Sequence, residues 1–227
     1  MKTKVVISFF LCLFFISLTS AVSAEKKYIY NESFEETLGG KRPVLGRDPD
    51  GIKYWMRWTD KNNEQSAQYA RTGKYSFKVI GAGGIYQDFA GGLIDSNETY
   101  QINAYAYIPQ GQVLASGSYA IVKLEWLNSG KRLLSKKSIE SRRVDNATQK
   151  GQWVLVEIKA KPPADARFGR VTIEYRAQGK NAGTIYWDDF NVRALSNFNV
   201  TNPNGKTAES KREDTSVGAG EEIDWQW

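Results

Sequence analysis

The apolar residues between positions 28 and 195 recur at every second position rather than at every third or fourth. A period of two places successive side chains on opposite faces of a β-strand, whereas a helix face needs a period near 3.6. In the clearest stretch, Tyr100, Ile102, Ala104, Ala106 and Ile108 alternate with Gln101, Asn103, Tyr105 and Tyr107. The pattern therefore predicts an all-β fold without a helix in this span.

Eight strands are predicted, and clusters of Gly, Pro, Asn and Asp separate them, as at residues 81–84 and 128–130. The predicted strands are residues 28–34, 75–80, 85–89, 99–108, 119–127, 153–159, 170–175 and 184–192. Short strands with such turns are typical of a β-sandwich jelly roll, in which two sheets close over one core.

Strand parity predicts which side chains are buried. The predicted core contains Val122, Leu124, Trp126, Val171, Ile173, Tyr175 and the apolar members of the 100–108 stretch. Trp153 is also assigned to the core. The alternate residues would line an outer surface that mixes tyrosines, amides, carboxylates and guanidinium groups.

The first 24 residues have the features of a signal peptide. Lys2 and Lys4 precede an apolar run over residues 5–18, and small residues surround the predicted cleavage site after Ala24. An uncleaved membrane anchor is the alternative, but the run is shorter than the roughly 20 residues that span a bilayer. We expect a mature chain that starts at Glu25 and is secreted or otherwise extracytoplasmic, in the periplasm or at the cell surface.

Composition narrows the possible functions. The only cysteine, Cys12, lies within the predicted signal peptide, so disulfides would not stabilise the mature chain. The net charge of +6 falls to +4 without Lys2 and Lys4, and the basic residues are scattered, which argues against nucleic-acid binding. Without histidine or a mature cysteine, the chain lacks the usual general base and nucleophile pairings.

Residues 196–227 differ in character from the rest of the chain. They are rich in Asn, Ser, Thr, Gly and charged residues, which predicts a disordered tail after a single domain at residues 25–195. The tail ends with Trp225 and Trp227 among acidic residues. These tryptophans are either an incidental terminus or a docking peptide for a protein partner.

Several short motifs occur in a fixed order: residues 31–35 (NESFE), 70–77 (ARTGKYSF), 85–89 (IYQDF) and 188–192 (DDFNV). With them, residues 28 to about 195 resemble the carbohydrate-binding modules of the galactose-binding-like jelly-roll superfamily, most closely the type associated with xylanases and glucanases. The resemblance implies a non-catalytic module that binds a polysaccharide. The alternatives are a secreted structural or adhesive β-sandwich that acts through protein contacts, and, more remotely, a divergent hydrolase.

The same resemblance implies a structural calcium ion between the first and last strands, with Glu35 and Asp188 as side-chain ligands and backbone carbonyls near the 71–73 turn. Calcium prefers several hard oxygen ligands. Parity places Asp188 with Phe190 and Val192, which predicts an inward carboxylate that needs a cation or hydrogen-bond donors. The alternative is that Glu35 and Asp188 accept backbone N–H bonds or pair with Arg71.

Two regions could bind sugar, because aromatic rings can stack on a pyranose while nearby polar groups bind its hydroxyls. The first is the segment 54–60 with Trp55 and Trp58, although the resemblance implies that one of these packs in the core. The second is an outer sheet face with Tyr105 and Tyr107 as platforms. The hydrogen-bonding groups predicted for that face are Gln101, Asn103, Glu125 and Arg176, and the resemblance adds Gln87. Ordinary cross-strand pairing is the alternative for the two tyrosines.

Overall fold

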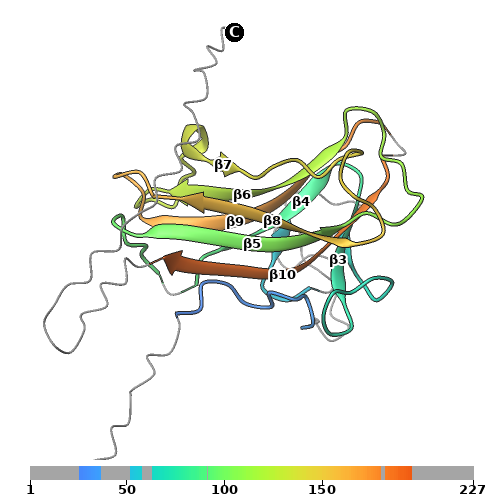
Figure 1. Cartoon of the computed structure of the whole chain (residues 1–227). Helices are drawn as coiled ribbons and strands as arrows, with labels where there is room; N and C mark the ends of the chain where they lie inside the picture. Colours follow the sequence, from blue (N-terminus) through green and yellow to red (C-terminus); the bar gives the residue numbers. More distant parts are fainter. Residues whose placement is uncertain (1–25, 37–51, 58–62, 91, 180–181, 196–227) are drawn as a thin grey trace, which may run out of the picture.

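The computed structural model describes residues 26–36, 52–57, 63–90, 92–179 and 182–195. These residues form two five-stranded sheets, in which every strand pairing is antiparallel. The first sheet has the order β1-β4-β9-β6-β7 and the second the order β2-β3-β10-β5-β8. The all-β sandwich that the sequence predicts is confirmed, and Figure 1 shows the two sheets lying over each other.

The first sheet consists of β1 (Met56–Arg57), β4 (Gly83–Asp88), β9 (Phe168–Arg176), β6 (Tyr119–Leu127) and β7 (Ile139–Glu140). The second consists of β2 (Asn63–Ser66), β3 (Ser76–Ile80), β10 (Thr184–Leu195), β5 (Thr99–Tyr107) and β8 (Trp153–Ala160). The helical content of the described residues is one short 3-10 turn, η1 (Ser135–Lys137). The described residues include no helix with the length and hydropathy of a membrane span.

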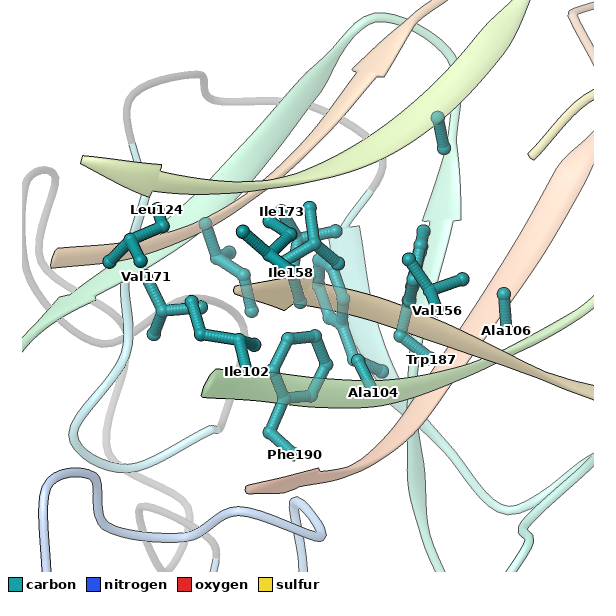
Figure 2. Close-up of a cluster of buried hydrophobic side chains, with 14 of the residues drawn as sticks. Ile102, Ala104, Ala106, Leu124, Val156, Ile158, Val171, Ile173, Trp187 and Phe190 are labelled. Carbon is teal, nitrogen blue, oxygen red and sulfur yellow. The ribbon is translucent and has the colours of Figure 1, made fainter. Parts of the chain in front are cut away.

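The core lies between the sheets, where the parity argument placed it. Ile102, Ala104 and Ala106 of β5 are fully buried and face residues such as Leu124 and Ile173 of the first sheet (Figure 2). Full burial of a large apolar side chain stabilises a fold by roughly 1.5–3 kcal/mol. The predicted core positions of β6 and β9 are likewise at most 1% exposed, so this part of the prediction is confirmed.

Residues 28–34, predicted as a strand, are not one. Asn31 and Phe34 have φ values of 51° and 60°, which extended backbone does not adopt. The Asn31 amide donates to the backbone carbonyls of Glu36 and Lys53, and its Oδ1 accepts from the Glu36 N–H. These local bonds stabilise a turn, so the segment covers one end of the core without joining a ladder.

Candidate functional site

A groove lies on the outer face of the first sheet. Strand register places Tyr86 of β4 opposite Thr172 of β9, and Thr172 opposite Lys123 of β6. Each of these residues alternates with buried neighbours, so its side chain points away from the core. The groove has a volume of about 370 Å³, and its lining is Tyr86, Lys123, Glu125, Leu133, Arg170, Thr172 and Glu174.

Ion pairs connect the charged side chains of the groove. Lys123 Nζ lies 3.0 Å from Glu125 Oε1 and 3.2 Å from Glu174 Oε2. Arg176 Nη2 contacts the same Glu174 oxygen at 3.1 Å and Glu140 Oε1 at 2.6 Å. Glu125 is only 4% exposed, and its second oxygen accepts a 2.7 Å bond from the Thr172 hydroxyl. The groove floor therefore presents a fixed set of donors and acceptors.

These contacts keep the groove charged near neutral pH. Burial opposes the charged form of Lys123, but the adjacent carboxylates of Glu125 and Glu174 outweigh it and raise the pKa of Lys123. Burial likewise acts to raise the pKa of Glu174, but Arg176 and Lys123 outweigh it and lower that pKa. Both side chains thus remain ionised, and the groove can offer charge-assisted hydrogen bonds to hydroxyl groups.

Tyrosine rings lie along this face together with guanidinium groups. The Arg170 guanidinium lies 4.1 Å from the centroid of the Tyr86 ring, and its Nε bonds Asp88 at 2.6 Å. Tyr119 begins β6 opposite Arg176. Its phenol oxygen accepts a 2.8 Å hydrogen bond from Arg176 Nη1. Aromatic surface beside fixed polar groups is the combination that a pyranose ring requires.

Two of the ligand residues predicted from the sequence are structural. Trp55 is 0% exposed, packs against Phe34 and Phe190, and donates its indole N–H to the Asn31 carbonyl at 3.1 Å. Gln87 is 5% exposed. Its amide accepts from the Tyr30 N–H at 2.6 Å and donates to the Tyr30 carbonyl at 3.0 Å. The prediction that Trp55 contacts a ligand is therefore wrong, and the Gln87 amide is used within the fold. Trp58 lies outside the described residues.

The predicted outer-face site was also wrong in grouping residues of both sheets. Tyr105 and Tyr107 lie on β5 of the second sheet, whereas Glu125 and Arg176 lie on the outer face of the first sheet. The outer faces of a sandwich point in opposite directions, so these residues cannot bind one short ligand together. Only Glu125 and Arg176 lie in or beside the groove.

The tyrosines of the second sheet contact other side chains through their rings. The Tyr107 ring lies 4.7 Å from that of Tyr69 and 5.3 Å from that of Trp153, and the Arg71 guanidinium lies 3.6 Å from the Tyr105 centroid. Trp153 pairs with Tyr107 across the strands, so its assignment to the core was wrong. Parity in β8 could have shown this, since Val156 and Ile158 are buried and Trp153 has the opposite parity.

The amides of this second face are also engaged. The Gln101 amide donates to Asn103 Oδ1 and to the Glu157 carboxylate, and its oxygen accepts from Arg193 at 2.7 Å. Burial first, and then the charge of Tyr69, raises the pKa of Tyr107. The second face therefore has the cross-strand pairing that was the alternative to a binding site.

Asp188 accepts hydrogen bonds from the start of the 71–74 turn, and Glu35 accepts them from its end. Asp188 is fully buried, and its Oδ2 accepts from the backbone N–H groups of Arg71 at 2.7 Å and Thr72 at 3.3 Å. Glu35 Oε1 accepts from the N–H groups of Lys74 at 3.1 Å and Tyr75 at 2.8 Å. Both carboxylates thus make the backbone N–H bonds that were the alternative to metal binding, while Arg71 pairs with Asp189 at 2.6 Å.

The parity predicted for Asp188 was wrong. Asp188 pairs with Tyr105, so it lies on the outer side of the second sheet and is buried beneath the 71–74 turn. A β-bulge between Asp188 and Asn191, with Asp189 at a φ of 48°, shifts the register and brings Phe190 and Val192 to the core. Burial is the main reason why the pKa of Asp188 rises to about 7.

The chain's similarity to known proteins agrees with this architecture. A family model described as a carbohydrate-binding domain matches residues 26–180. A search of curated proteins finds no match.

Among solved structures, the chain is similar to the C-terminal family 22 carbohydrate-binding module of Clostridium thermocellum Xyn10B, with 16% identity over 74% of this chain and 94% of that one, and a TM-score of 0.47. It is also similar to the CBM22-1 xylan-binding domain of Paenibacillus barcinonensis Xyn10C, with 14% identity over 65% and 90% of the two chains, and a TM-score of 0.43. Because both TM-scores are below 0.5, the ligands of those proteins cannot be transferred to this chain.

Proposed function

This chain belongs to the family of carbohydrate-binding domains, and from that membership we propose that it binds a polysaccharide in the groove over β4, β9 and β6 as a non-catalytic module. The observation that supports this site most strongly is the hollow beside Tyr86, in which Lys123, Glu125, Thr172 and Glu174 present fixed hydrogen-bonding groups. A polysaccharide chain needs this combination of ring surface and polar groups along an open face.

The state of the groove carboxylates supports a binding role without catalysis. A glycosidase needs one carboxylic acid with a raised pKa to protonate the leaving group. Lys123 bridges Glu125 and Glu174, and the contacts of Glu174 with Arg176 and Lys123 lower its pKa despite burial. Glu174 therefore lacks the environment of a general acid.

We expect Tyr86→Ala to weaken polysaccharide binding by about tenfold, because it removes the ring beside the polar groups and the support for Arg170. Affinity electrophoresis in gels that contain soluble xylans, glucans and galactans measures this. Tyr107→Ala on the second sheet is the matched control and should bind like the parent chain. The reverse result would move the site to the tyrosines of β5, and no retention in any gel would contradict the proposal.

A calcium ion at the 71–74 turn is a further part of this proposal. The charge of the site fits a divalent cation: in the described part of the chain, no Lys or Arg forms an ion pair with the buried Asp188, and Glu35 contacts the other end of the same turn. The Glu35 carboxyl lies close to the backbone of this turn, since a Cβ on Gly73 would lie 2.5 Å from Glu35 Cδ. The described residues contain no cluster of three acidic, His or Cys side chains, so backbone carbonyls would supply the other ligands.

Calcium binding predicts a higher melting temperature in calcium than in chelator, because a ligand that binds only the folded state stabilises it. A calcium concentration 100 times the dissociation constant stabilises the fold by about 2.7 kcal/mol. Differential scanning calorimetry of the parent chain and of Glu35→Gln measures this difference. Equal melting temperatures for the parent chain in calcium and in chelator would exclude this ion.

We also propose that the domain acts outside the cytoplasm, after removal of residues 1–24. The sequence pattern of this segment supports export. The predicted tail, with Trp225 and Trp227 as contacts for a protein partner, lies outside the described residues and stays a prediction.

A further inference from the structure

A strongly basic segment lies beside the groove. Residues 131–143, which we call the basic arm, contain six Lys or Arg residues and one acidic residue. The basic residues are Lys131, Arg132, Lys136, Lys137, Arg142 and Arg143, and the acidic one is Glu140. The arm therefore has a net charge of +5 in a chain whose total is +6.

The fold places this arm at the edge of the groove. It includes η1 and β7, and β7 pairs with β6 so that Glu140 lies opposite Lys123. Backbone bonds from Leu134 N to the Trp126 carbonyl and from Ser141 N to the Val122 carbonyl attach the rest of the arm to β6. Leu133 of the arm lines the groove itself. Figure 1 shows β7 beside β6, on the side of the sandwich away from β10.

Few of these charges are neutralised within the described residues. Lys137 pairs with Asp165 at 2.7 Å, and the arm's Glu140 is used by Arg176. None of the other five basic side chains has a carboxylate partner in the described part of the chain. On the second sheet, Lys78 and Lys159 each pair with an acidic residue, Arg71 of the adjacent turn pairs with Asp189, and Arg193 bonds the Gln101 amide. Unbalanced positive charge thus gathers along the arm, although Arg142 bonds the Leu155 carbonyl of β8 at the edge of the second sheet.

A second hollow lies where the arm returns to β6. It has a volume of about 320 Å³ and is lined by Ser116, Gly117, Ser118, Tyr119, Arg143, Asp145, Asn146 and Ala147. The Arg143 guanidinium lies 4.1 Å from the Tyr119 ring centroid, and Arg176 lies 5.5 Å from the same centroid. Arg176 is held by Glu140 and Glu174, whereas Arg143 has no carboxylate partner among the described residues. A tyrosine beside such an arginine suits a sugar that carries a carboxylate, because the ring can stack while the arginine binds the anion.

We propose that the polysaccharide bound in the groove is acidic, with the carboxylates of uronic acid residues facing the basic arm, including Arg143. This inference rests on the proposed function and specifies its ligand class. The argument is charge complementarity, because a polyanion is attracted to the arm beside the groove, where five of six cations lack a carboxylate partner among the described residues. A neutral polysaccharide would make only the contacts with the groove floor.

The test compares acidic and neutral polysaccharides that share a backbone. Three pairs serve as probes in affinity electrophoresis: glucuronoxylan with its carboxyl-reduced form, carboxymethyl cellulose with hydroxyethyl cellulose, and polygalacturonate with its methyl ester. We expect stronger retention by the acidic member of at least one pair at low salt. Because salt screens exposed charges, this preference should fall at 0.5 M NaCl, where the Debye length is about 4 Å.

Matched variants connect the preference to the arm. Lys136→Gln with Arg143→Gln should weaken binding to the acidic probe by about tenfold and leave the neutral probe unchanged. Lys159→Gln with Lys161→Gln removes the same charge from the β8 end of the second sheet and should change neither. Melting temperatures of both double variants confirm folding.

The outcomes separate the two proposals. Two results would overturn the acidic-ligand inference and leave groove binding in place. The first is equal retention of the acidic and neutral members of every bound pair. The second is an acidic preference that the arm variant and its control keep to the same extent. Retention of no probe overturns the proposed function, and the inference with it.

Discussion

Trp55→Ala is expected to lower the free energy of unfolding by about 3–5 kcal/mol, the range measured when large aromatic core residues are truncated. Trp55 is 0% exposed and contacts the rings of Phe34 and Phe190 at centroid distances of 5.2 Å and 5.4 Å. Its indole N–H also bonds the Asn31 carbonyl. Truncation would leave a cavity and remove the donor that holds the Asn31 turn.

Chemical denaturation of the parent chain and the variant measures this loss. Trp153→Ala is the matched control, because Trp153 is half-buried on the outer face and its loss should cost about 1 kcal/mol. Where Trp55→Ala is still folded, it should bind polysaccharide with unchanged affinity. A stable variant that has lost binding would instead support the original sequence-based assignment of Trp55 to a ligand platform.

Sequence periodicity predicted the core well because burial acts on each strand separately. Within β5, β6 and β9, every second residue faces the same core, so alternation alone identifies Ile102, Leu124 and Ile173 as buried. The same alternation identifies outward residues such as Tyr86 and Thr172 of the groove. Applied to β8, it would also have placed Trp153 outside.

The candidate site could not be assembled from the sequence, because periodicity does not say which strands share a sheet. Tyr107 and Arg176 both alternate with core residues, yet β5 and β9 belong to different sheets. That assignment depends on pairings between distant segments, such as β5 with β8 and β6 with β9. The groove therefore depends on the pairing of β4, β9 and β6, which strand periodicity does not predict.

The sequence also did not predict the local exceptions to the strand pattern. The turn at Asn31 depends on side-chain bonds to Glu36 and Lys53, and the bulge after Asp188 changes parity within a strand that otherwise alternates. Both features involve non-glycine residues with positive φ, at Asn31, Phe34 and Asp189. Such conformations cost energy and are set by the surrounding structure, so residue type alone does not predict them.

In chelator, the stability of the domain is expected to fall as the pH rises from about 4 to about 7, because of Asp188. Burial raises the pKa of this carboxyl to about 7 in the folded chain, whereas an unfolded aspartate titrates near 3.9. The folded state therefore keeps a proton that the unfolded state has lost. The contribution of Asp188 is fully present below about pH 4 and is lost by about pH 7, to an extent of at most roughly 4 kcal/mol.

Calcium should oppose this loss, since a bound cation favours the carboxylate over the protonated acid. Denaturation curves at pH 4.5, 6 and 7.5, each in chelator and in calcium, measure both effects, and the stabilisation by calcium should increase with pH. Asp189→Asn is an informative variant, because the charge of Asp189 helps to raise the pKa of Asp188 and its removal should shift the chelator curve to lower pH. A stability in chelator that does not fall between pH 4.5 and 7.5 would show that backbone N–H bonds from Arg71, Thr72 and Asp189 suffice to hold Asp188 ionised.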